Sequence, residues 1–194
     1  FSAVTRPGRY WLEAGEVRTP AFSIDPEVWR DSVWKTINSF YCQRCGQAIP
    51  GIHDVCHQDW RAIHAGATNF INGGWHDAGD LSQGLVNSSE AIYAMLTLAE
   101  ALDGRDREVP RRLLEEARWG LAWLRKTRFA DGSRMTWATM DYWTDGELGT
   151  VDDTLGEVRN SPYDNFMAAC AEALAARVLR RTDPPLAQTS AALA

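Results

Sequence analysis

Hydrophobic and polar residues alternate at the start of the chain and follow a different period afterwards. In residues 1–24, Tyr10 and Leu12 share one face, a break follows at 14–16, and further apolar positions occur over 17–24. Alternation on both sides of a turn is typical of a β-hairpin. A hairpin alone is only marginally stable, so we expect this one to belong to a larger sheet.

From Asp25 the apolar residues recur at helical spacing. Asp25 is suited to cap a helix that has Pro26 at its first position and ends near Gly46. The pattern predicts further helices over about 81–102, from Pro110, over about 162–181, and from Leu186. The side chains expected to face inward are Val28, Trp29, Val33, Trp34, Ile37, Phe40 and Tyr41; Val86, Ile92, Leu96 and Ala99; Leu113, Ala117, Leu121 and Leu124; and Phe166, Met167, Cys170, Leu174 and Val178.

Two long segments, residues 47–79 and 129–161, show no clear period and are predicted as loops. The second carries an acidic pair, Asp152 and Asp153. A solvated loop explains this pair as well as a metal site does. Loops of this length in a compact domain are usually functional or held by a cross-link. Helical hairpins joined by long loops on one side are typical of an α/α toroid.

Composition narrows the class of protein. The 194 residues are 45% hydrophobic and 24% charged, as in one globular unit with a short appendage. A net charge of −6 argues against binding to nucleic acid or to an anionic membrane surface, and no apolar run is long enough to span a bilayer. The chain opens at Phe1 without a signal peptide, so we interpret it as a window on a longer protein.

Residues 73–80, Gly-Gly-Trp-His-Asp-Ala-Gly-Asp, concentrate the candidate chemistry. Asp77 and Asp80 form a carboxylate pair of the kind in which one group orients a water and the other takes its proton. The glycines let the backbone pass close to a neighbour. The alternative is a capped turn, because Asp and Gly also favour turns and helix N-caps.

The nine tryptophans are a high count, and core packing accounts for most of them. Four lie in predicted loops, namely Trp60, Trp75, Trp137 and Trp143. Exposed aromatic faces of this kind suit a cleft that stacks sugar rings.

Two cysteines and two histidines, Cys45, Cys56, His57 and His76, are named here the Cys/His cluster. Thiolate and imidazole ligands bind Zn²⁺ tetrahedrally, and four protein ligands make a closed, structural site. Such a site would fasten the 47–76 segment to the end of the first helix. It leaves no position for a catalytic water, which argues against a zinc-dependent hydrolase. A disulfide between the two cysteines is an alternative in an oxidising compartment.

The remaining cysteines and histidines have less distinctive surroundings. Cys42 precedes Cys45 by three positions, a spacing also seen in metal or redox pairs, but it lies among the apolar positions of a helix. Cys42 and Cys170 are therefore expected to be small buried side chains. His53 and His64 are interpreted as ordinary loop histidines.

Three segments together, 40–46 (Phe-Tyr-Cys-Gln-Arg-Cys-Gly), 56–59 (Cys-His-Gln-Asp) and 73–80, resemble the N-terminal part of glycoside hydrolase family 9 catalytic domains. These are cellulases and related β-glucanases. Residues 120–124 are similar, less specifically, to the family's next helix. The hairpin at 9–24 looks like the last strands of the immunoglobulin-like module that precedes many members.

The resemblance implies a mainly α fold. Residues 25–194 would be the N-terminal part of an (α/α)6 barrel, truncated here, with the substrate groove at one end. Residues 1–24 would be the C-terminal hairpin of an Ig-like β-sandwich. The implied reaction is inverting hydrolysis of β-1,4-glucosidic bonds in cellulose or a related β-glucan polysaccharide or oligosaccharide.

The resemblance also implies residue roles. Asp80 would be the general base, and Asp77 would help to hold the attacking water. Trp75 and Trp143 are the candidate substrate-binding residues, and the Cys/His cluster matches the family's structural zinc ligands. Calcium is common in the family, but we assign no calcium ligands in this chain.

One element of the family is missing. Its general acid is a Glu far downstream, and neither Glu157 nor Glu172 lies in a matching context. We therefore expect this chain to require the remainder of the barrel for catalysis. The alternative is a helical glucan-binding module, cross-linked by zinc and without catalysis. Large, insoluble substrates imply a secreted or periplasmic protein.

Overall fold

The computed structural model describes residues 3–139 and 143–194. The chain divides into two compact units, residues 1–38 and 39–194. The proposed boundary at residue 24 between two domains stays a prediction.

The first unit contains the expected hairpin. Strand β1 (Gly8–Tyr10) pairs antiparallel with β4 (Phe22–Ile24), and β2 (Glu13–Ala14) pairs with β3 (Val17–Arg18). Gly15 turns the chain between β2 and β3 with a φ of +62°, a conformation that glycine adopts without steric cost.

Helix α1 (Arg30–Cys42) is shorter than predicted at both ends. The carboxylate of Asp25 accepts a hydrogen bond from the backbone N–H of Glu27 at 2.8 Å and so closes a turn instead of capping the helix. Trp29 therefore lies outside the helix and is 72% exposed, which corrects its assignment to the inward face. Val28, at 44% exposure, is corrected in the same way.

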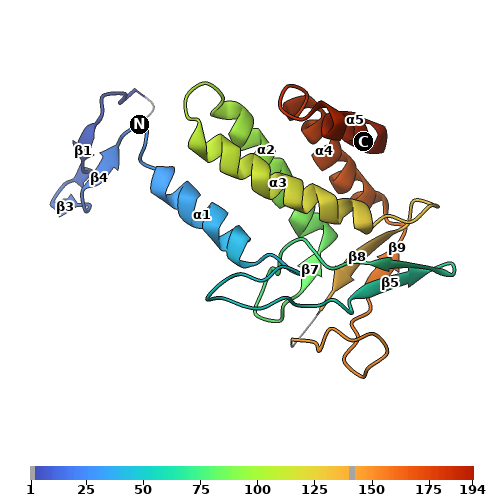
Figure 1. Ribbon diagram of the computed structural model, residues 1–194. Helices are drawn as coiled ribbons and strands as arrows, with labels where there is room; N and C mark the ends of the chain where they lie inside the picture. The colour runs from blue at the N-terminus through green and yellow to red at the C-terminus, as the bar shows by residue number, and fades with distance from the viewer. Residues whose placement is uncertain (1–2, 140–142) are drawn as a thin grey trace. The chain divides into compact units, whose positions relative to one another are not determined.

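Four helices lie side by side in the second unit (Figure 1): α2 (Leu85–Ala101), α3 (Glu108–Lys126), α4 (Pro162–Val178) and α5 (Pro184–Leu193). Helix α2 packs against α3 and α4, and α4 packs against α5. Three of the four predicted inward residues of α2 and all four of α3 are buried: Ile92, Leu96, Ala99, Leu113, Ala117, Leu121 and Leu124. Within the described residues, none of the helices combines the length and the hydrophobicity of a membrane-spanning segment.

The predicted inward face of α4 is largely wrong. Phe166 is 71% exposed and Cys170 is also exposed, whereas the alanines Ala168, Ala171 and Ala175 are fully buried. Of the predicted residues Leu174 is buried, at 6% exposure, so the buried face of α4 combines this leucine with the three alanines. Helix α4 packs against α2 and α5. The expectation that Cys170 is a buried apolar side chain is also wrong.

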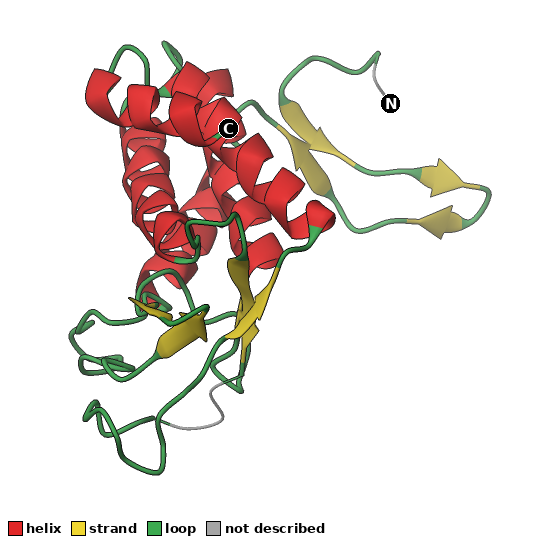
Figure 2. Cartoon of the chain, turned by 90° about the vertical axis from the view of Figure 1, so that its right-hand side faces the viewer, coloured by secondary structure: helices red, strands yellow, loops and turns green. Residues whose placement is uncertain are grey.

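Both predicted loops contain strands. β5 (Arg61–His64) and β6 (Ala67–Phe70) form a hairpin within 47–79, and β7 (Gln83–Gly84), β8 (Arg134–Ala138) and β9 (Glu157–Arg159) form a three-stranded sheet. Both views place these strands at one end of the helices (Figures 1 and 2). The mainly α class is confirmed, with a β layer that the sequence pattern did not predict.

Candidate active site and metal cluster

Residues 73–80 run alongside the turn that follows α1. The backbone N–H of Cys45 donates to the carbonyl of Gly74 at 3.0 Å, and that of His76 donates to the carbonyl of Gln43 at 2.9 Å. Gly74 has a φ of +64°, and a Cβ there would lie 2.9 Å from the indole of Trp123. The close backbone approach that the glycines predicted is therefore present, and position 74 requires glycine.

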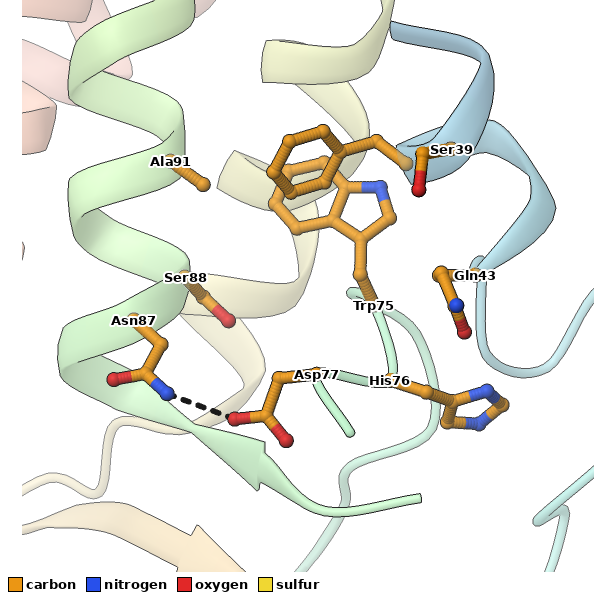
Figure 3. Close-up of a pocket in the computed structure, with 9 residues that line it drawn as sticks. Ser39, Gln43, Trp75, His76, Asp77, Asn87, Ser88 and Ala91 are labelled. Atoms are coloured by element: carbon orange, nitrogen blue, oxygen red, sulfur yellow. Dashed lines mark hydrogen bonds between the residues drawn. The ribbon is translucent and has the colours of Figure 1, made fainter. Parts of the chain in front are cut away.

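The Asp77 carboxylate is held by two side chains from the segment that follows it. Nδ2 of Asn87, in the first turn of α2, donates to Oδ2 at 2.8 Å (Figure 3), and the hydroxyl of Ser82 donates to Oδ1. The backbone N–H of Asp77 donates in turn to the carbonyl of Ser82 at 2.9 Å. Asp77 is exposed, but its orientation is fixed.

Ser82 also binds the second carboxylate. Its hydroxyl lies 2.8 Å from Oδ1 of Asp80, and its backbone N–H lies 3.2 Å from the same oxygen. The hydrogen bond from the Ser82 hydroxyl lowers the pKa of the Asp80 carboxyl, which favours the ionised form that a general base needs. Because a hydroxyl has one proton, it can donate fully to only one carboxylate at a time.

Neither Ser82 nor Asn87 was identified from the sequence. An Asp-x-Ser triplet before a helix is a weak signal for a side-chain-closed turn, and this chain uses the same turn at Asp131 and Ser133. The pattern therefore pointed to a turn without indicating that the serine joins two carboxylates.

Asp77 borders a cavity of about 270 Å³, lined by Ser39, Phe40, Gln43, Trp75, His76, Asp77, Asn87, Ser88 and Ala91. Trp75 is only 3% exposed, packs edge-on against Phe40 at 5.2 Å, and donates its indole N–H to Glu116. A sugar ring stacks on an exposed aromatic face, and Trp75 offers little of one. Its substrate-binding role stays a prediction.

The four residues of the Cys/His cluster lie together in the structure. All four side chains are buried, and one donor atom from each lies within 4.8 Å of the others. Nδ1 of His57 lies 3.6 Å from Sγ of Cys45 and 3.2 Å from Nε2 of His76, which is 3.9 Å from Sγ of Cys56. Metal–ligand bonds of 2.0–2.3 Å in a tetrahedron place the ligand atoms roughly 3.3–3.8 Å apart, so the set fits an ion such as Zn²⁺.

The pKa values of the two thiols of the cluster shift in opposite directions. Burial raises the pKa of Cys45, and a hydrogen bond from Cys45 lowers the pKa of Cys56 to about 2. Both thiols are free, so the disulfide alternative is not formed.

Trp143 lies against this cluster. Its ring stacks on His57 at 5.6 Å and on His53 at 5.4 Å, with 27° between the planes in each pair, and meets His76 edge-on at 5.6 Å. His53, interpreted above as an ordinary loop residue, is thus part of an aromatic cover over the cluster. Trp143 remains 53% exposed, and its substrate-binding role stays a prediction.

The other loop residues have structural partners. Trp60 is fully buried, so it belongs to the core and not to a sugar-binding cleft. His64 binds Asp131 at 2.8 Å, and that hydrogen bond lowers the pKa of Asp131 to about 2. Asp153 forms an ion pair with Arg61 at 2.6 Å.

Carboxylate oxygens of Asp59, Asp145 and Asp152 lie within 4.8 Å of one another. Asp59 is buried and accepts hydrogen bonds from the hydroxyl of Thr144 at 2.6 Å and the N–H of Gly146 at 3.2 Å. These hydrogen bonds hold Asp59 to the segment of Thr144 and Gly146 without an ion. Calcium binding therefore stays a prediction.

The sequence matches the family described as Glycosyl hydrolase family 9 over residues 29–194. The chain belongs to this family. Endoglucanase D of Acetivibrio thermocellus is 24% identical over 213 residues, an alignment that covers 97% of this chain and 34% of that protein. The chain therefore spans about a third of the length of this curated relative and is part of a family 9 catalytic domain.

Solved structures that resemble this chain include endoglucanases. A single mutant of the thermostable endoglucanase from Alicyclobacillus acidocaldarius is 25% identical with a TM-score of 0.71, covering 100% of this chain and 40% of that one. A Zn-binding triple mutant of the family 9 endoglucanase J30 is 26% identical with a TM-score of 0.68, covering 97% and 40%. The resemblance inferred from three short segments is confirmed.

Proposed function

We propose that the full-length protein hydrolyses β-1,4-glucosidic bonds in cellulose or a related β-glucan with inversion, and that this chain supplies the base side of its active site. Membership of the family and the endoglucanase relatives support the reaction class. On this proposal, residues 25–194 are part of an (α/α)6 barrel and residues 1–24 the end of an Ig-like module. Because polymeric glucans are too large to enter a cell, the protein is secreted or periplasmic.

One observation supports placing both carboxylates on the base side: Ser82 bonds to Asp77 and to Asp80, and Asp77 lines a cavity. An inverting glycosidase needs a base that takes a proton from water on one face of the sugar and an acid about 6.5–9.5 Å away on the other. Two carboxylates that share one hydroxyl lie on the same side. By the resemblance to the family, Asp80 takes the proton, and Asp77, oriented by Asn87, holds the water.

The general acid comes from a part of the protein outside these residues. Glu172 is buried, and both of its oxygens accept hydrogen bonds from Arg125 at 3.0 Å, so it cannot reach a glycosidic oxygen. Glu157 is paired with Arg159. On this proposal the rest of the barrel supplies the general acid.

The Cys/His cluster is the proposed site of a structural Zn²⁺. When bound, the ion supplies folding energy and no reaction chemistry, because four protein ligands fill its tetrahedral shell. Its ligands come from the turn after α1, from the Cys56-His57 step and from the motif itself. Cross-linking them positions His76 and, through it, the neighbouring Asp77.

The test is Asp80→Asn in the full-length protein, with release of reducing ends from a soluble β-glucan as the readout. We expect a loss of about 10²- to 10⁴-fold, the usual contribution of a general base, with an unchanged melting temperature. Asp131→Asn, in the equivalent Asp-x-Ser turn, is the control and retains activity.

Undiminished activity of Asp80→Asn contradicts the assignment of the base. A full-length protein that binds β-glucan without cleaving it supports instead the zinc-cross-linked binding module.

A further inference from the structure

Trp137 borders a second cavity, of about 320 Å³, that the proposed mechanism does not use. Trp137 is 39% exposed, whereas the other four residues of β8 are buried. Ligand pockets are typically lined by aromatic side chains with a few polar groups, and an exposed indole at a cavity fits this description.

The ring of Trp137 is held in a fixed orientation. It lies on Gly84, the residue before α2, where a Cβ would be only 2.6 Å from Cζ3 of the indole. The indole N–H donates to the hydroxyl of Thr139 at 3.0 Å. Glycine at 84 is therefore required for this placement, and a ligand would meet a preorganised aromatic surface.

Polar side chains complete the lining: Asn87 of α2, Glu157 and Arg159 of β9, and Asp164 in the first turn of α4. Glu157 and Arg159 neutralise each other as an ion pair. In the described parts of the chain, no group donates a hydrogen bond to the Asp164 carboxylate. The carboxylate of Asp164 and the amide of Asn87 can form hydrogen bonds with the hydroxyl groups of a ligand. The negative charge of Asp164, which no cation among the described lining residues neutralises, disfavours an anionic ligand.

Asn87 connects this cavity to the candidate active site. It lines both cavities, and its Nδ2 donates to Asp77 (Figure 3). The two cavities adjoin at Asn87, so a polymer bound beside Asp77 can extend into the Trp137 cavity.

We propose that the Trp137 cavity is a subsite for one uncharged glucosyl ring of the β-glucan. The ring stacks on the indole, and its hydroxyl groups bond to Asp164 and Asn87. This inference rests on the proposed function, because it assigns the cavity to the same polymer that Asp80 cleaves. It also predicts that a glucan is preferred over a polymer that carries uronic acids.

The experiment measures kcat and KM of the full-length protein and of Trp137→Ala on cello-oligosaccharides of increasing length. We expect kcat/KM to fall about tenfold, mainly through KM, on oligomers long enough to occupy the subsite, and to be unchanged on the shortest cleaved oligomer. Trp137→Phe keeps an aromatic face and retains most of the activity. Trp29→Ala removes an exposed tryptophan that does not line the cavity and serves as the control.

A loss in Trp137→Ala that is equal at every length, or no loss at all, overturns the subsite. If Trp137→Ala does not fold, Asp164→Ala provides the same comparison. Absence of β-glucan hydrolysis by the unaltered protein contradicts the proposed function itself, so the two failures are distinguishable.

Discussion

Arg44 and Glu116, 72 positions apart, form a buried two-point ion pair. Nε and Nη2 of Arg44 lie 3.1 and 2.8 Å from the two carboxylate oxygens, and the side chains are 8% and 0% exposed. Glu116 also accepts the indole N–H of Trp75 at 3.2 Å. One carboxylate on α3 thus binds both the residue before Cys45 and the residue before His76.

Glu116→Gln should destabilise the protein strongly, because it removes the buried carboxylate that binds Arg44 at two points and leaves only the half-exposed Glu115, 4.0 Å away, as a counter-charge. Breaking a buried pair in this way costs about 3–5 kcal/mol of unfolding free energy, which urea denaturation measures. Glu115→Gln is the matched control, since Glu115 is 43% exposed and 4.0 Å from Arg44. Equal losses in the two variants would contradict the importance of the buried pair.

Ser82→Ala should shift the pH dependence of hydrolysis. The hydrogen bond from Ser82 lowers the pKa of Asp80, so its removal raises that pKa towards the ordinary value. A base must be ionised to act, and the acidic limb of kcat/KM against pH therefore moves to higher pH. The full pH profile of the full-length protein is the measurement.

Ser133→Ala is the control for this shift, because Ser133 makes the same two bonds to Asp131 that Ser82 makes to Asp80. Its acidic limb should coincide with that of the unaltered protein. A Ser82→Ala profile that keeps the original limb, or moves it to lower pH, would show that Asp80 is not the titrating base.

Removal of metal should lower the melting temperature and change the fluorescence of Trp143. A structural ion contributes folding energy, and the Trp143 ring stacks on two histidines at the cluster. Differential scanning calorimetry and emission spectra before and after chelation, with native mass spectrometry to count bound zinc, are the measurements.

Cys56→Ser should reproduce the effect of the chelator and make the protein insensitive to it. Cys170→Ser is the control, because Cys170 is exposed on α4, outside the cluster. A melting temperature that chelation leaves unchanged would argue against the zinc assignment.

The parts of the fold that sequence predicted best are those with one buried face of large residues. Leu113 and Leu121 mark α3 because large apolar and charged residues alternate at helical spacing. The same reasoning largely failed on α4, where Leu174 is buried as predicted but Phe166 is exposed and three alanines complete the buried face. Alanines occur all around this helix, so hydropathy alone does not distinguish its inward face.

Strand β8 was missed although Arg134, Met135, Thr136 and Trp137 alternate between polar and apolar residues, because four residues are a short signal within a long segment. Its burial does not follow this alternation, since Arg134 and Met135 are both buried.

The candidate site likewise contains residues that the sequence predicted and residues that it did not. The Cys/His cluster was predictable because four residues of two uncommon types lie in or near one glycine-rich motif, and the structure brings all four together. Ser82 and Asn87 are common polar residues whose roles depend on where α2 begins. Trp60 and Trp143 look alike in sequence, and only the packing distinguishes a core side chain from one that covers the cluster.

Gly120→Ala should destabilise the protein although alanine favours a helix by about 1 kcal/mol over glycine. A Cβ at position 120 would lie 2.3 Å from Cη2 of Trp75 and 2.7 Å from Ile92, and both neighbours are buried. Overpacking of this kind costs about 1–3 kcal/mol, so we expect a net loss in unfolding free energy, measured by urea denaturation. Gly79→Ala is the control for stability, because a Cβ there meets nothing within 4 Å and the backbone is unstrained. A Gly120→Ala variant as stable as the unaltered protein would mean that the Trp75 ring can move, and with it the cavity beside Asp77.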